Sequence, residues 1–171
     1  SIQVDLGVRY TASGVRAGLF GYHYRINDLI ERYQTATDFF FFRNRGRAQI
    51  RGVELEVQAV AGAKVTIEAT AALTRGRALD DDKALDDIPP ATLTLSVRRP
   101  IGSRGFAQIR GAFYDADARP GPTEIRMPGY TLLDVLGGVT LAKALDVNLT
   151  LRNLLDQTYP STPDARAMPA P

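Results

Sequence analysis

The chain has 171 residues and a net charge of +2 at pH 7, with charged residues making up 23% of the composition. Its arginines are scattered rather than clustered, which disfavours nucleic-acid binding, and the absence of cysteine excludes disulfides and thiolate chemistry. It contains no apolar run of the roughly 18 residues that a transmembrane helix needs, and its first five residues are typical of a strand rather than a signal peptide.

Alternation of apolar and polar residues with a period of two dominates the chain from its start. The apolar positions, taken at every second residue, run from Ile2 to Tyr10, Val53 to Ala59, Val65 to Leu73, Leu93 to Val97 and Val147 to Leu151. A strand whose two faces meet different media produces this period, whereas a helix does not. No segment has convincing helical spacing, so the sequence predicts an all-β chain.

The links between the predicted strands alternate strictly between short and long. Short links lie at 12–14, 61–64, 100–103 and 142–145, and long links lie near 35–43, 76–89, 115–128 and 154–171. This order predicts an antiparallel up-and-down meander of about eight strands, with the short turns at one end and the long loops at the other, as in bacterial outer-membrane barrels. The alternation changes phase between Ile50 and Val53, which predicts a β-bulge at Gly52.

Several charged residues alternate with the apolar sets and are candidates for a water-facing surface. Glu54, Glu56 and Glu68 could serve acid–base catalysis, but a wet barrel interior explains them more simply. The lone His23 has no visible partner for metal binding, and we expect a solvated lumen residue. The acidic segments Asp80–Asp82 and Asp86–Asp87 lack the spacing of an EF-hand loop, so a solvated loop is favoured over Ca²⁺ binding. The candidate lumen or ligand contacts are His23, Arg25, Glu54, Glu56, Glu68, Arg98, Arg110, Asp134 and Arg152.

Four consecutive aromatic residues, Phe39, Phe40, Phe41 and Phe42, cannot all face one side of a strand. We expect them, together with Tyr130, to anchor the protein at a membrane interface, where aromatic rings are favoured, and we keep ligand contact as the second interpretation. The sequence has no phosphate-binding glycine loop, no G-x-S-x-G and no H-E-x-x-H. We therefore expect neither catalysis nor a bound cofactor or metal.

Five segments in order carry a resemblance to a known family. They are 15–30, 43–56, 85–90, 130–134 and 147–159, of which Arg43-Asn-Arg-Gly-Arg-Ala-Gln-Ile-Arg-Gly-Val-Glu-Leu-Glu56 is the most specific. They resemble successive strands of TonB-dependent outer-membrane receptors. The resemblance implies a 22-stranded barrel, closed by an N-terminal plug, that imports its ligand with energy from TonB. The chain would then be a fragment of one barrel domain, an open segment over residues 1–171, without the plug, the TonB box or the closing strand.

The implied function is part of the barrel wall of a receptor in the outer membrane of a Gram-negative bacterium. Its ligand would be a siderophore, haem, cobalamin or a similar small molecule. The implied partners are outer-membrane lipid, the remaining strands and plug of the same protein, the TonB complex through that plug, and the ligand. A passive porin-like barrel is the alternative, and a soluble β-sandwich binding module is a weaker one, since it predicts comparable loops at both ends.

Overall fold

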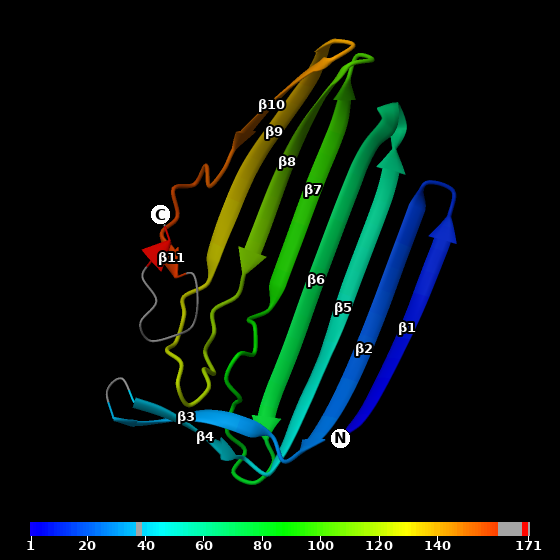
Figure 1. Ribbon diagram of the computed structural model, residues 1–171. Coiled ribbons are helices and arrows are strands. Elements are labelled where there is room, and N and C mark those ends of the chain that lie inside the picture. The colour runs from blue at the N-terminus through cyan, green and yellow to red at the C-terminus, as the bar shows by residue number, and fades with distance from the viewer. Residues whose placement is uncertain (37–38, 161–168, 171) are drawn as a thin grey trace.

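The computed structural model describes residues 1–36, 39–160 and 169–170, and it shows one curved antiparallel sheet (Figure 1). The strands of this sheet are β1 (Ile2–Ala12), β2 (Val15–Asn27), β5 (Arg47–Ala61), β6 (Val65–Ala78), β7 (Thr92–Ile101), β8 (Gly105–Tyr114), β9 (Tyr130–Ala142) and β10 (Leu145–Leu151). The remaining elements are the hairpin β3 (Ile30–Ala36) and β4 (Phe39–Asn44), the short pair β11 (Tyr159–Pro160) and β12 (Pro169–Ala170), and the 3₁₀ turn η1 (Gly62–Lys64).

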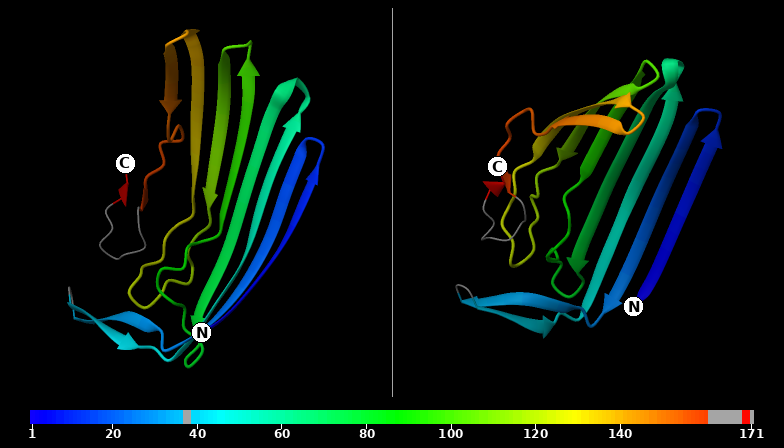
Figure 2. Two further views of the ribbon diagram at one scale, coloured as in Figure 1. Left: turned by 45° about the vertical axis from the view of Figure 1, so that its right-hand side comes forward. Right: turned by 45° about the horizontal axis from the view of Figure 1, so that its top comes forward.

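The predicted meander is confirmed. The eight strands are hydrogen-bonded in sequence order, β1-β2-β5-β6-β7-β8-β9-β10, and every adjacent pair is antiparallel. The short turns meet at one end of the sheet and the long connections at the other (Figures 1 and 2). One of the long connections differs from the expected loop, because between β2 and β5 it forms the separate hairpin β3–β4.

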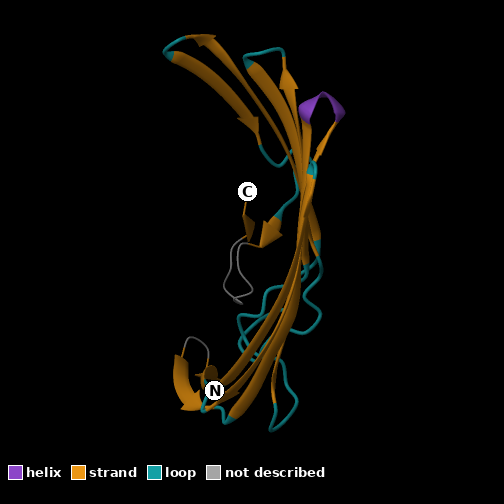
Figure 3. Ribbon diagram, turned by 90° about the vertical axis from the view of Figure 1, so that its right-hand side faces the viewer, coloured by secondary structure: helices purple, strands orange, loops and turns teal. Residues whose placement is uncertain are grey.

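The sheet has one concave and one convex face (Figure 3). Strand β11 lies inside the curve, and the ring of its Tyr159 stacks on Tyr130 of β9 with 4.8 Å between centroids. Tyr130 therefore faces the concave side, and the strand register assigns its cross-strand neighbours Tyr114, Thr92 and Ala72 to the same face.

Apolar side chains occupy the convex face in rows that run across the strands. One such row joins Leu19, Leu55, Ala71, Leu93 and Phe113 from β2 through β8. On the concave face of the same strands lie Glu54, Glu56 and Glu68. The two-sided pattern of the sequence is thus the two-sided surface of one curved sheet.

The expected β-bulge at Gly52 is wrong, because the register of β5 with both neighbours runs unbroken through Gly52. The ring of Tyr22 lies over Gly52, where a Cβ atom would collide with it, and its hydroxyl lies 2.7 Å from Thr74 Oγ1. Ile50 simply faces the concave side, where it packs against buried Ala48 and its neighbours. The apolar residues change phase here because the concave face becomes apolar at its loop end, and no extra residue is inserted into the strand.

A small apolar core lies where the long loops meet the sheet. Its fully or nearly buried members are Ala48, Ala78 and Leu85, with Ile26, Leu29, Ile50 and Ile88 packed around them. The 79–91 loop supplies Leu85 and Ile88, so this core holds that loop against the concave face. Within the described ranges, no helix has the length and apolar character to cross a membrane.

Candidate functional site

The concave face presents a polar surface between the short turns and the loops. Glu68 accepts a hydrogen bond of 3.0 Å from the Gln58 amide, and the Arg98 guanidinium lies 3.5 Å from the centre of the Phe106 ring. The side chains of Glu54, Glu56, Glu68, Arg98 and Arg110 are all exposed there. The structure places these five predicted residues on the predicted side, and their contact with a ligand stays a prediction.

Of the two other predicted residues, Asp134 has a structural role. Asp134 Oδ1 accepts the backbone N–H of Asn153 at 3.0 Å, and the Asn153 side chain in turn bonds both the N–H and the C=O of Gln157. Asp134 therefore fixes the path of the chain after β10. Arg152 follows β10 directly and is exposed.

The lumen position expected for His23 and Arg25 is wrong. His23 pairs in register with Val4 of β1 and Arg51 of β5, and Arg25 pairs with Ile2 and Gln49. Both side chains therefore belong to the convex face, at its loop end. Their polarity suggested the lumen, although both residues continue the period of the aliphatic set.

The three long connections are joined into one loop cluster, formed by β3–β4, residues 79–91 and residues 115–129. Thr123 is the central contact: its hydroxyl receives a hydrogen bond from Arg32 at 3.0 Å and donates one to Asp86 at 2.9 Å. Its backbone N–H also donates to Asp86, at 3.0 Å. Glu124 accepts the backbone N–H groups of Asp87 and Gly121. These contacts fix the three loops relative to one another at the loop end of the sheet.

Glu31 anchors the β3–β4 hairpin to its neighbours. Its side chain is buried and accepts two hydrogen bonds from Arg43. The Nε atom of Arg45 lies 3.4 Å from Glu31 Oε1, and the guanidinium of Arg45 forms a second ion pair with Asp81 at 2.7 Å. Arg45 thereby connects the base of the hairpin with the 79–91 loop. No local sequence pattern predicts the roles of Glu31 and Thr123, because these roles depend on partners from other segments.

The membrane-interface position expected for Phe39, Phe40, Phe41 and Phe42 is wrong. These residues form β4, and the hairpin extends from the loop end of the sheet toward the concave side (Figure 3). Phe39, Phe41 and Phe42 are exposed there. Phe40 is only half-buried, pairs with Gln34 of β3, and has the Arg32 guanidinium 5.0 Å from the centre of its ring. Anchoring in lipid requires rings on the convex side, whereas this hairpin carries its three exposed rings toward the concave side.

The interface position expected for Tyr130 is wrong for the same reason. Its ring lies inside the curve, stacked between Tyr114 at 4.5 Å and Tyr159 at 4.8 Å. This stack joins the end of β8, the start of β9 and the chain after β10.

Arginines pair with the first three aspartates of the 79–91 loop. Asp80 pairs with Arg47 at 3.2 Å, and Asp82 pairs with Arg77 at 2.7 Å. The backbone N–H and guanidinium of Arg47 lower the pKa of Asp80 below its usual range. Burial raises the pKa of Glu124, although its two backbone hydrogen bonds oppose this. The described residues contain no group of three or more His, Cys, Asp or Glu side chains arranged to hold a metal ion.

A family model described as "TonB dependent receptor-like, beta-barrel" matches residues 1–154. The fold is similar to the copper transporter OprC, with a TM-score of 0.90, 19% identity, and coverage of 99% of this chain and 29% of that one. It is also similar to the FrpB iron transporter from Neisseria meningitidis (TM-score 0.75, 16% identity, 98% of this chain, 29% of that one). The ferric yersiniabactin uptake receptor FyuA from Yersinia pestis gives a TM-score of 0.76 and 19% identity, over 92% of this chain and 25% of that one.

The chain thus spans less than a third of each of these similar structures. No curated protein matches the sequence.

Proposed function

Because the chain belongs to the TonB-dependent receptor β-barrel family, we propose that it forms part of the wall of an outer-membrane receptor that imports a small ligand. The observation that carries this proposal is the separation of surfaces on one sheet. The convex face exposes large apolar side chains on every strand of the sheet, and the concave face exposes carboxylates and guanidinium groups. Lipid solvates the first surface and water the second, so neither carries a large desolvation cost.

The edges of the sheet support a place within a larger barrel. In the part of the chain that the structure describes, β1 pairs only with β2, and β10 pairs only with β9. In a bilayer each unpaired N–H or C=O group costs several kcal/mol. Further strands of the same receptor would pair with both edges, a plug would fill the space on the concave side, and the plug would transmit force from the TonB complex.

The ligand would enter between the long connections, which meet at one end of the sheet. There the loop cluster brings cationic side chains and the exposed rings of β4 to the concave side. Solved structures of similar fold are described as transporters or receptors for copper, iron, ferric yersiniabactin and ferric enterobactin. We therefore infer a siderophore, haem, cobalamin or a similar metal-bearing molecule as the ligand class.

Uptake by cells tests this proposal. A strain lacking the gene should lose growth on one metal-bearing compound under limitation of that metal, and the complete gene should restore growth. Collapsing the proton gradient should stop accumulation of the labelled compound if import is energised. Uptake that continues after collapse at a rate proportional to concentration would instead identify a passive pore.

A further inference from the structure

Two arginines face each other on the convex side, just beyond the aliphatic rows at the loop end. Arg51 of β5 and Arg75 of β6 are direct cross-strand partners, and His23 of β2 continues the same row. One step toward the short turns the row is aliphatic, with Val53 opposite Leu73. The arginine pair therefore lies where the apolar band ends.

The two arginines carry like charges at close range, and an anion would relieve their repulsion. Directly opposed side chains on antiparallel strands have Cβ atoms about 4.5–5.5 Å apart, and two like charges there destabilise the sheet. Among the described residues no carboxylate pairs with Arg51 or Arg75, whereas the neighbouring Arg77 is paired with Asp82 at 2.7 Å. The pair thus presents an uncompensated double positive charge on an outward surface.

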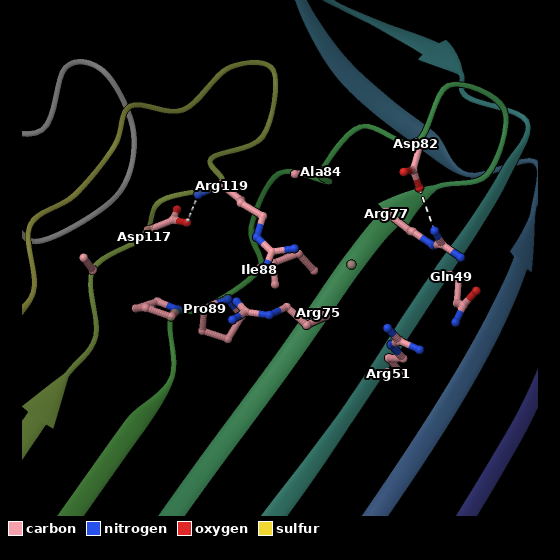
Figure 4. Close-up of a pocket in the computed structure, with 13 residues that line it drawn as sticks. Gln49, Arg51, Arg75, Arg77, Asp82, Ala84, Ile88, Pro89, Asp117 and Arg119 are labelled. Atoms are coloured by element: carbon pink, nitrogen blue, oxygen red, sulfur yellow. Dashed lines mark hydrogen bonds and ion pairs between the residues drawn. The ribbon is translucent and has the colours of Figure 1, made fainter.

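A cavity of about 270 Å³ opens beside the pair. Figure 4 shows Arg51 and Arg75 on one side of it, with Pro89 and the 117–119 segment on the other. The acidic groups at its wall already have partners: Asp82 is held by Arg77, and Asp117 accepts the backbone N–H of Arg119. The cavity has room for a phosphate group with several waters, since about 10–15 Å³ of such space holds one water.

An apolar hollow adjoins the cavity on the membrane side and shares the same two arginines. Its aliphatic lining comes from Val4, Leu6, Val53 and Leu73. Gly21 of β2 lies among these residues and has no side chain to fill the hollow. The polar rim of the hollow is formed by His23, Arg51 and Arg75. An aliphatic hollow that ends at paired guanidinium groups matches a molecule with a hydrocarbon chain and an anionic head.

We propose that Arg51 and Arg75 bind the phosphate of a lipid headgroup, whose acyl chain lies in the hollow along Gly21. Guanidinium groups bind phosphate through paired, charge-assisted hydrogen bonds, and basic residues next to an apolar surface are how membrane proteins select anionic lipids. A free phosphate ion would use the arginines but not the hollow, so the lipid accounts for both. The proposal rests on the proposed outer-membrane barrel, because only there does the convex face meet lipid.

The test uses the complete receptor in neutral detergent, with phosphatidic acid, diacylglycerol and inorganic phosphate as probes and native mass spectrometry as the readout. The wild-type protein should retain phosphatidic acid in preference to diacylglycerol. The double variant R51Q/R75Q should bind phosphatidic acid about 25-fold more weakly, since each basic residue near an anionic lipid contributes about fivefold in affinity. Inorganic phosphate should compete poorly.

The matched control is Arg99→Gln. Arg99 also lies on the convex face, opposite Ala107 of β8, but at the short-turn end. It should leave phosphatidic acid binding unchanged. If R99Q lost as much phosphatidic acid binding as R51Q/R75Q, the proposal would be overturned in favour of general charge attraction. If inorganic phosphate competed as strongly as the lipid itself, the site would bind a free phosphate ion and not a lipid.

The conservative variant R51K/R75K keeps the charges and should retain most of the preference, which protects the test if the glutamine variant misfolds. Heat-modified gel migration reports barrel folding separately. A folded barrel without lipid preference would refute this site alone, whereas failure of the wild-type receptor to form a barrel would refute the proposed function.

Discussion

Leu95 lies on the convex face of β7, between Ala69 of β6 and Gly111 of β8. If lipid covers this face near its midplane, Leu95→Arg should destabilise the barrel by about 2–4 kcal/mol. The matched control is Thr94→Arg, one residue away on the concave side, which should cost far less because water solvates the new charge. Reversible folding of the complete barrel into lipid vesicles measures both, and equal losses would contradict the assignment of the two faces.

At Gly52, the ring of Tyr22 from the neighbouring strand β2 occupies the space that a side chain would otherwise fill. A Cβ atom there would collide with the Tyr22 ring and lie 2.8 Å from the backbone oxygen of Leu73. Gly52→Ala should therefore destabilise the protein by about 1–3 kcal/mol, as overpacking does.

The control for Gly52 is Gly62→Ala in the turn η1, where an added Cβ meets nothing within 4 Å. Its effect should stay within about 0.5 kcal/mol. Denaturant unfolding of the vesicle-inserted barrel compares the two variants. A Gly52→Ala protein as stable as the wild type would show that the packing of the Tyr22 ring over residue 52 does not require a glycine there.

Among the elements, the 79–91 loop is held to β5 by charge. Asp80 accepts hydrogen bonds from the backbone N–H of Arg47 at 3.1 Å and from its guanidinium at 3.2 Å, which lowers the pKa of this carboxylate. A lowered pKa means that the contact contributes its full stability above the unfolded value. The contribution is lost as pH falls below about 4 toward the folded value.

Hydrogen exchange of the loop backbone should therefore accelerate at acidic pH, once corrected for the intrinsic pH dependence of exchange. Asp80→Asn should exchange faster already at pH 7 and show less further change on acidification. The exposed Asp146, in the β9–β10 hairpin at the other end of the sheet, offers the control Asp146→Asn. That variant should leave the loop unchanged. A pH-independent loop in the wild-type protein would contradict the role of Asp80.

Among the described residues, the edge strands β1 and β10 of the main sheet each pair with one neighbour only, and the convex face exposes a large apolar surface. Ile2, Leu6 and Leu149 are each more than 60% exposed. Such edges and surfaces associate in water. The 171-residue chain expressed alone should therefore aggregate and fail to insert into vesicles as a monomer, as size-exclusion chromatography and heat-modified gel migration would reveal. A monodisperse monomer with cooperative unfolding would favour the soluble β-domain alternative.

The strands of the main sheet, their order and the separation of the two faces could be predicted from the sequence, whereas the β3–β4 hairpin could not. Each follows from the period-two pattern and the lengths of the links, which are local properties of the chain: Val53 and Glu54 face opposite sides whatever the rest of the protein does. The links also predicted which end carries the long loops, and the ordered motifs predicted the family.

The positions of residues near the loop end depend instead on contacts between distant segments. His23 is an exception, because its period-two phase already assigns it to the convex face and only its polarity suggested the lumen. Phe40 lies on a hairpin that turns inward, a direction that aromatic composition does not encode. Ile50 needs no bulge, because a later loop supplies Leu85 to the core beside it. Periodicity reports the alternation of one strand, whereas the positions of Phe40 and Ile50 depend on segments that only folding brings together.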